Sequence, residues 1–253
     1  MNTKLLDKLV KNGNCFDKMN CVNLKYGLDV LVHEEGFGIR EYIASKGYCL
    51  DILVNDTSMD VRREVAKQGY GLNILVHDEE PAVRIEVARH GYGLDILIND
   101  TDPRVLVEVA RQGYGLDRLI HDSSAWVREA VARQGYGLDI LVHDDVFTVR
   151  AAVASQGYAL DVLVYSENKY IRRAVAQQGY GLNLLVRDED EGVRAVVAEQ
   201  GYGLNILVSD SSSNVKNAVL EHNYGLEKLA KDENCIIAAE AQARINMQKV
   251  MSN

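Results

Sequence analysis

Proline, cysteine and long apolar runs are scarce in this chain of 253 residues. It has two prolines and only four cysteines, and the irregular spacing of these cysteines excludes a disulfide framework and a paired-cysteine zinc site. No stretch reaches the roughly 18 apolar residues of a membrane span, and the start of the chain lacks the apolar centre and cleavage site of a signal peptide. We therefore expect a soluble, cytoplasmic protein.

Basic charge and aromatic residues other than tyrosine are also in short supply. The chain has one tryptophan and three phenylalanines, and its net charge is −9. An acidic chain is disfavoured as a general nucleic-acid coat, because phosphate binding draws its free energy from clustered lysine and arginine. The hydrophobic content of 47% is enough for a packed core and excludes a largely disordered chain.

The chain is instead rich in an internal repeat of 22 residues. Tyrosine recurs at this interval from Tyr26 to Tyr224, and two columns of leucine keep the same period, from Leu6 to Leu226 and from Leu9 to Leu229. The leucine columns define eleven units. A fixed short period predicts an elongated stack in which each unit buries its apolar face against its neighbours.

The ends of the array are less regular than its middle. In the first unit, Asp17 stands where later units carry valine or isoleucine. Terminal units of a stack are expected to be atypical, because one of their faces meets water. We predict a single repeat domain over 1–253, with a degenerate N-terminal cap at 1–27, regular repeats at 28–225, and a C-terminal capping unit and helix at 226–253.

One half of each unit has the signals of an α-helix of nine or ten residues. The column of Glu80 consists mostly of serine, aspartate and asparagine, which cap helix N-termini, and Pro81 follows at the first helical position. Gly91 stands where a helix ends in a left-handed residue. A helix this short is not stable alone in water, so its stability must come from its neighbours.

The other half of each unit, "LDILVHD" at 138–144, is compatible with two structures. Leu94, Leu97 and Ile98 follow the i, i+3, i+4 spacing of a helix, and Asp95 could cap such a turn. This spacing favours a short helical or 3₁₀ turn. A short strand is the alternative, and it predicts a leucine-rich-repeat horseshoe.

The repeat also resembles a known family. Two spaced leucines, an aspartate and then Val-Arg-x-x-Val-Ala, as in "LNILVHDEEPAVRIEVA" at 72–88, resemble the leucine-rich repeat variant family, a relative of HEAT-type α-solenoids. The resemblance covers Leu28 to about Val219, and the unit here is shorter than is usual in the family. It implies an all-α fold: a right-handed α-solenoid superhelix of about eleven 22-residue repeats, each an α-helix plus a short helical or 3₁₀ turn.

A column of arginine runs through the array from Arg40 to Arg194, and Lys216 continues it. Most of these residues follow an acidic residue by six positions, as Arg62 follows Asp56. We predict that the column forms a structural ladder of charge-assisted hydrogen bonds with acids of its own and adjacent units. The alternative is a surface that binds anions or nucleic acid. We likewise expect the tyrosine rings to pack between units with their hydroxyls bonded to backbone.

Function should lie in positions that vary while this scaffold stays fixed. A helix that buries Val83 and Val87 turns positions 82, 85 and 89 outward. In the middle repeats, these outward positions and the adjacent loops concentrate aromatic residues and arginine, the types that dominate binding hot spots. The candidate protein-binding residues are Arg89, Arg104, Arg111, Trp126, Arg133, Phe147, Tyr165, Tyr170 and Arg173. The alternative is scattered surface aromatics, with each arginine neutralised by a glutamate on its own helix.

These patterns favour a non-catalytic protein–protein interaction scaffold or adaptor that presents variable positions on a rigid solenoid. A nucleic-acid-binding repeat protein that uses the central basic and aromatic stripe is the alternative. No Ser/His/Asp grouping lies outside the repeat, and the glycines terminate helices instead of cradling phosphate. We expect a protein partner and no membrane, and no catalytic residue, metal or cofactor.

Overall fold

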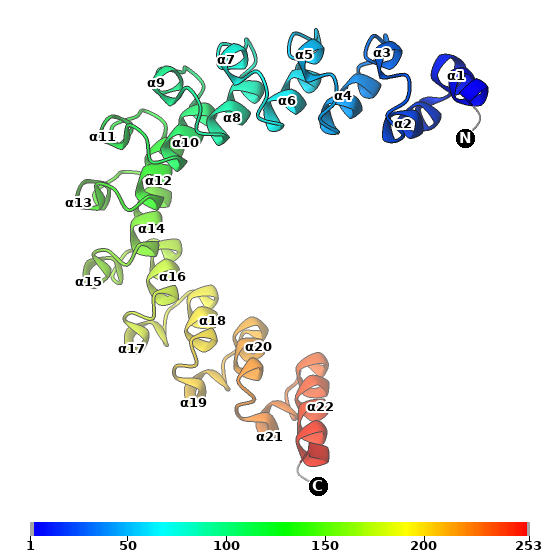
Figure 1. Cartoon of the computed structure of the whole chain (residues 1–253). Helices are drawn as coiled ribbons and strands as arrows, with labels where there is room; N and C mark the ends of the chain where they lie inside the picture. Colours follow the sequence, from blue (N-terminus) through cyan, green and yellow to red (C-terminus); the bar gives the residue numbers. More distant parts are fainter. Residues whose placement is uncertain (1–2, 252–253) are drawn as a thin grey trace. The chain divides into compact units, whose positions relative to one another are not determined.

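The computed structural model describes residues 3–251, and every regular element in this range is a helix (Figure 1). The chain forms two compact units, one ending at Ala130 and the other beginning at Val131. The division falls inside one helix, α12 (Ala125–Arg133). The prediction of an all-α repeat fold is confirmed, whereas the right-handed superhelical twist stays a prediction.

The first unit alternates short and long helices after an opening pair. These helices are α1 (Thr3–Asn12), α2 (Cys15–Asn23), α3 (Leu28–Leu31), α4 (Phe37–Ser45), α5 (Leu50–Leu53), α6 (Met59–Lys67), α7 (Leu72–Leu75), α8 (Pro81–Arg89), α9 (Leu94–Leu97), α10 (Pro103–Arg111), α11 (Leu116–Leu119) and the start of α12. Each nine-residue helix packs against the next nine-residue helix, and the four-residue helices form a second row beside them (Figure 1).

The second unit continues the same alternation and closes with a long helix. Its elements are the end of α12, then α13 (Leu138–Leu141), α14 (Phe147–Ser155), α15 (Leu160–Leu163), α16 (Lys169–Gln177), α17 (Leu182–Leu185), α18 (Glu191–Glu199), α19 (Leu204–Leu207), α20 (Ser213–Glu221), α21 (Leu226–Leu229) and α22 (Cys235–Met251). No helix in 3–251 is both long enough and apolar enough to cross a membrane.

The short segment of each repeat is a single helical turn, so the strand alternative and its horseshoe are wrong. In α9, Leu97 N–H bonds the carbonyl of Gly93 at 2.9 Å with α-helical spacing, and Asn99 N–H bonds the carbonyl of Ile96 at 3.1 Å with 3₁₀ spacing. The residue at the N-cap is Gly93, so the predicted capping role of Asp95 is also wrong.

Gly93 is fixed by two independent constraints. Its φ of +61° is left-handed, where only glycine is free of strain. A Cβ added there would lie 2.5 Å from Cγ2 of Val76 in the preceding repeat. The glycine therefore sets both the turn and the close approach of consecutive repeats.

The long helix begins and ends as the sequence predicts. In α8, Glu80 is the extended N-cap, Pro81 occupies the first turn, and Gly91 after the C-terminus has a φ of +68°. The side chain of Glu80 makes no cap bond, however. Its backbone N–H donates instead to Oδ1 of Asp78 at 3.0 Å, so the aspartate two residues earlier performs the capping role in this repeat.

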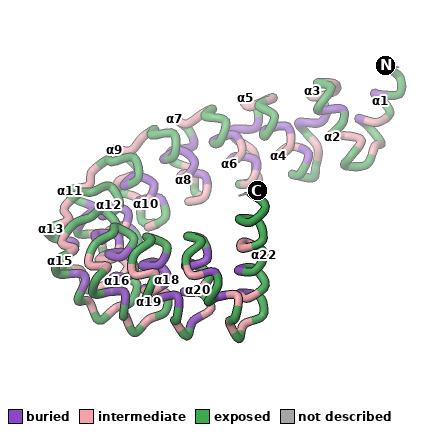
Figure 2. Tube along the Cα trace, turned by 90° about the horizontal axis from the view of Figure 1, so that it is seen from below, coloured by how far each residue is buried: buried purple, intermediate pink, exposed green. Residues whose placement is uncertain are grey.

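The core lies between the two rows of helices (Figure 2). Val83, Val87 and Ala88 of α8 are fully buried, as are Leu75 and Leu97 of the flanking short helices. The small alanine is needed because consecutive long helices pack directly against each other. The valine columns and the leucine column of Leu97 therefore form the interior that the repeat pattern predicts, whereas the leucine column of Leu94 is half-buried.

The two ends of the chain depart from the repeat for local reasons. Asp17 and Asn14 form a reciprocal capping box, in which each side chain accepts the backbone N–H of the other at 3.2 and 3.0 Å. This role explains why an acid replaces the valine or isoleucine of later repeats. At the other end, Arg244 of α22 donates to the carbonyl of Leu220 at 2.6 Å and anchors the closing helix.

The tyrosine column differs from its prediction. Tyr92 is exposed, and its backbone N–H, not its hydroxyl, bonds the carbonyl of Val87 at 3.4 Å. Within 3–251, no hydroxyl of the column bonds a backbone atom, and Tyr26 donates its hydroxyl to the carboxylate of Asp7 at 2.6 Å. The predicted bonds from the hydroxyls to backbone are therefore wrong within 3–251, whereas the packing of the rings between units stays a prediction.

Candidate protein-binding site

The arginine column ties each repeat to the next. Arg62 donates from Nε and Nη2 to the two carboxylate oxygens of Asp78, at 2.6 and 2.9 Å, and from Nη1 to the carbonyl of Asp56 at 2.9 Å. We call each such pair, a cation of one repeat and an acid of the next, a rung. The rungs are Lys18–Glu34, Arg40–Asp56, Arg62–Asp78 and Arg84–Asp100 in the first unit, and Arg172–Asp188, Arg194–Asp210 and Lys216–Asp232 in the second.

The rungs are poorly accessible and chemically satisfied. The side chains of Arg62 and Asp78 are only 10% and 5% exposed. Burial raises the pKa of Asp56, but hydrogen bonds from Arg40 and from the N–H of Ser58 outweigh it, so that the pKa is lowered overall. The prediction of a structural ladder is confirmed for these pairs, and their arginines are not free to bind a partner.

A second set of ion pairs covers the candidate arginines of the first unit. Arg89 bonds Glu86 on its own helix at 2.8 Å and reaches Glu108 on the next long helix at 3.4 Å. Arg111 bonds the same Glu108 at 2.8 Å, and Arg104 bonds Asp102 at 2.7 Å. Glu86 and Glu108 are buried. The sequence predicts a pair only between each glutamate and the arginine three residues later on the same helix, not the contact from Arg89 to the next helix. The positive charge of this unit's stripe is therefore largely offset.

The first unit also carries the lone tryptophan. Trp126 is the second residue of α12 and is 65% exposed. Arg133, the last residue of the same helix, is exposed and belongs to the second unit. The nine candidate residues are thus divided between the two units.

In the second unit, two candidate aromatics form a stack. Phe147 opens α14 and Tyr170 is the second residue of α16, and their ring centroids are 5.5 Å apart with an interplanar angle of 24°. The rings are 37% and 52% exposed. Nζ of Lys169 lies 5.6 Å from the centroid of Tyr170 and bonds Asp190 at 2.9 Å. Lys169 was not among the predicted residues, although it occupies the same helix-start column as Phe147.

Arg173 lies one turn after Tyr170 and differs from the arginines of the first unit. It is exposed and makes no hydrogen bond or ion pair with any residue in 3–251. The reason lies three residues earlier: in the same column of the first unit, Arg63 bonds Asp60 at 3.0 Å, whereas Tyr170 stands in the position of that aspartate before Arg173. Phe147, Tyr170 and Arg173 therefore form an exposed group, which we call the aromatic–arginine patch.

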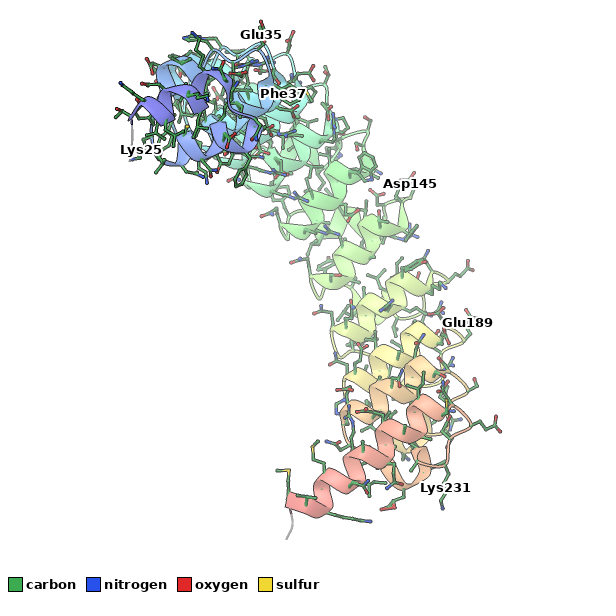
Figure 3. All side chains as sticks on the ribbon, turned by 90° about the vertical axis from the view of Figure 1, so that its right-hand side faces the viewer. Lys25, Glu35, Phe37, Asp145, Glu189 and Lys231 are labelled. Atoms are coloured by element: carbon green, nitrogen blue, oxygen red, sulfur yellow. The ribbon has the colours of Figure 1, made fainter. Side chains whose placement is uncertain are left out.

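Tyr165 contributes to a different feature. It lies in the turn between α15 and α16, is 73% exposed, and lines a shallow hollow with Leu184 and Glu189. Glu189, in the turn before α18, extends away from the helices (Figure 3) and approaches Arg172 to 3.2 Å. The structure thus brings Phe147 and Tyr170 together and assigns Tyr165 to the ladder side of its repeat.

No metal centre is formed by the residues that the structure describes. Within 3–251, no three histidine, cysteine, aspartate or glutamate side chains gather closely enough to hold a metal ion. Cys21 is buried, and burial, together with the nearby charge of Asp17, raises the pKa of its thiol. His33 and His77 are exposed and lie two repeats apart, with Asn55 at the same position of the repeat between them.

No protein-family model matches the chain, and no curated protein is significantly similar to it in sequence. The class is defined by the structure itself. The chain is a helical repeat protein whose helix pairs pack in the order of the sequence.

Proposed function

We propose that this protein is a non-catalytic scaffold or adaptor that binds another protein through the aromatic–arginine patch. Its repeat is of the leucine-rich repeat variant type, close to HEAT-like solenoids, as the sequence of 72–88 indicates. Such a fold supplies a rigid support, and its function depends on the side chains that it presents.

The unpaired guanidinium of Arg173 beside a stacked pair of exposed rings carries this proposal. Aromatic residues and arginine are the most frequent hot-spot residues, because they bury a large area and still make directed polar bonds. Other arginines at ladder and stripe positions, such as Arg62 and Arg111, are engaged by carboxylates of the protein itself. Arg173 has no such partner in 3–251, so an external carboxylate can bind it without displacing an internal one.

The patch also indicates the chemistry of its partner. The exposed faces of Phe147 and Tyr170 favour an apolar or aromatic side chain, and Arg173 favours an aspartate or glutamate close to it. We infer that the partner presents an apolar residue flanked by an acid. A nucleic acid is less suited, because Arg89, Arg104 and Arg111, which would contact phosphates, are already paired with carboxylates.

Affinity capture tests the proposal. The wild-type chain, the variant Phe147→Ala/Tyr170→Ala/Arg173→Ala and a control Tyr202→Ala are each immobilised and exposed to lysate, and the captured proteins are identified by mass spectrometry. Tyr202 is a suitable control because it is an exposed tyrosine of the same unit outside the patch. A partner retained by the wild type and the control, but lost by the triple variant, supports the patch.

Two further measurements make this result decisive. The unfolding midpoint of the triple variant should stay within about 2 °C of the wild type, because surface substitutions change stability little. The purified partner should then bind the wild type with an affinity at least 100-fold higher than the triple variant, as expected for hot-spot residues. A partner that binds both forms equally, or binding of RNA that falls steeply with added salt, would overturn the proposal.

A further inference from the structure

Two rungs of the ladder are incomplete, each in a different way. In the first unit, Leu106 takes the place of the arginine, so the carboxylate of Asp122 makes no ion pair with any residue in 3–251. In the second unit, Ser166 takes the place of the aspartate, sixteen residues after Arg150, where Asp188 follows Arg172. The first gap lacks a positive charge, and the second lacks a negative one.

Arg150 is nevertheless held in the geometry of a complete rung. Its Nη1 donates to the carbonyls of Asp144 and Asp145, as Nη1 of Arg172 donates to the carbonyls of Ser166 and Glu167. These bonds fix the plane of the guanidinium before any carboxylate binds. Nε and Nη2 of Arg150 then have no acceptor in the part of the chain that the structure describes.

Ser166 replaces only half of what an aspartate does. In the complete rung, Asp188 accepts from Nε and Nη2 of Arg172 at 2.7 and 2.8 Å and also accepts the N–H of Asp190 at 2.9 Å. Ser166 keeps the second role, because its Oγ accepts the N–H of Asn168 at 3.2 Å. The chain therefore stays capped, while the two donors of Arg150 stay open.

We propose that the gap between Arg150 and Ser166 is a binding site for a small oxyanion, of the carboxylate or phosphate type. Two acceptor oxygens of one anion can satisfy Nε and Nη2 together, as the oxygens of Asp188 do for Arg172. Glu167 does not take this place. It makes no ion pair with Arg150, although the equivalent Glu189 lies 3.2 Å from Arg172.

Nitrogen-15 NMR of the arginine side chains tests the site in the whole chain. Inorganic phosphate and acetate are titrated separately at constant ionic strength, with chloride as the balancing anion, and the Nε–H signals of Arg150 and Arg172 are followed. The Nε–H signal of Arg150 is identified as the one that is missing from the spectrum of the variant Arg150→Gln. A saturable shift of the Arg150 signal, with no shift at Arg172, supports the proposal, and the tighter of the two anions identifies the type.

Ser166→Asp is the matched variant, because it completes the rung with a carboxylate of the chain itself. It should abolish the response of Arg150 to either anion. Phosphate should also raise the melting temperature of Ser166→Asp by about 2 °C less than it raises that of the wild type. The general stabilisation by phosphate is the same in both proteins, so it cancels in this difference. Shifts that do not saturate, or that persist unchanged in Ser166→Asp, would overturn the site.

Discussion

Removal of one carboxylate from a complete rung should destabilise the protein far more than removal of the acid beside it. Asp78 accepts two bonds from Arg62 and the capping N–H of Glu80, and its side chain is 5% exposed. Glu79, the next residue, also approaches Arg62, at 3.5 Å, but is 82% exposed. The two acids share a cation and differ in burial, so they form a matched pair.

The expected magnitude follows from what Asp78→Ala leaves behind. Breaking a buried ion pair costs about 3–5 kcal/mol, because the remaining charge is uncompensated. Arg62 keeps its bonds to the carbonyls of Asp56 and Thr57 and is 10% exposed, so we expect the lower end, about 3 kcal/mol. Glu79→Ala should change the free energy of unfolding by less than about 0.5 kcal/mol.

Urea unfolding followed by circular dichroism measures both variants. The slope of the transition should be unchanged, so the difference appears as a shift of the midpoint. A loss below about 1 kcal/mol for Asp78→Ala, or equal losses for both variants, would refute the argument that the rungs hold consecutive repeats together.

Three further predictions follow from the same packing. Gly93→Ala should lower the free energy of unfolding in urea by at least about 2 kcal/mol, because the added Cβ strains the left-handed backbone and meets the preceding repeat. Ala159→Gly removes a Cβ at a φ of 52° and should raise the free energy of unfolding by about 1 kcal/mol. Changes of the same sign in both variants would contradict this account. Leu106→Arg should raise the free energy of unfolding by about 1 kcal/mol, because it supplies a cation to Asp122, and a loss of stability would show that burial of the leucine matters more. The pKa of Asp56 is lowered in the folded state, so the carboxylate stabilises the fold above about pH 4, the pKa of the unfolded state, and this stabilisation is lost as the pH falls through the folded-state pKa. Thermal melts at acid pH should therefore show a smaller loss of stability for Asp56→Asn than for the wild type. An equal loss in both proteins would contradict this prediction.

The repeat made the fold predictable from the sequence. With eleven aligned copies, a position that holds the same residue type in most repeats can be assigned even where one repeat alone is ambiguous. The columns of Val83 and Val87 identify the buried face of the long helix, and the column of Gly91 identifies its end. The short segment was harder, since its five residues suit a strand as well as a turn. Its helical form follows a left-handed residue, such as Gly93 before α9 or Ala159 before α15, and the close approach of Gly93 to Val76 in the preceding repeat depends on how the repeats stack.

The sequence predicts which candidate residues are exposed but not which of them lie together. The spacing of outward positions on the long helix correctly predicts that Tyr170 and Arg173 are exposed. Whether an arginine is free depends on the next helix, because Arg89 reaches Glu108 in the following repeat. The stack of Phe147 on Tyr170 likewise joins different columns of neighbouring repeats, and such contacts between columns depend on the stacking geometry.

Deletion of one whole repeat, residues 160–181, tests the central claim most directly. The deletion joins Ala159 to Leu182 in register and places Asp188 sixteen residues after Arg150, where Ser166 stood. Because each repeat contacts only its neighbours, we predict that circular dichroism shows the helical signal per residue of the wild type and a cooperative thermal transition. Deletion of only half a repeat, residues 160–170, should lower the helical signal per residue and broaden or split the thermal transition, because it breaks the stacking of the adjacent repeats. Loss of the helical signal in the whole-repeat deletion, or the same signal and transition in both deletions, would contradict the account.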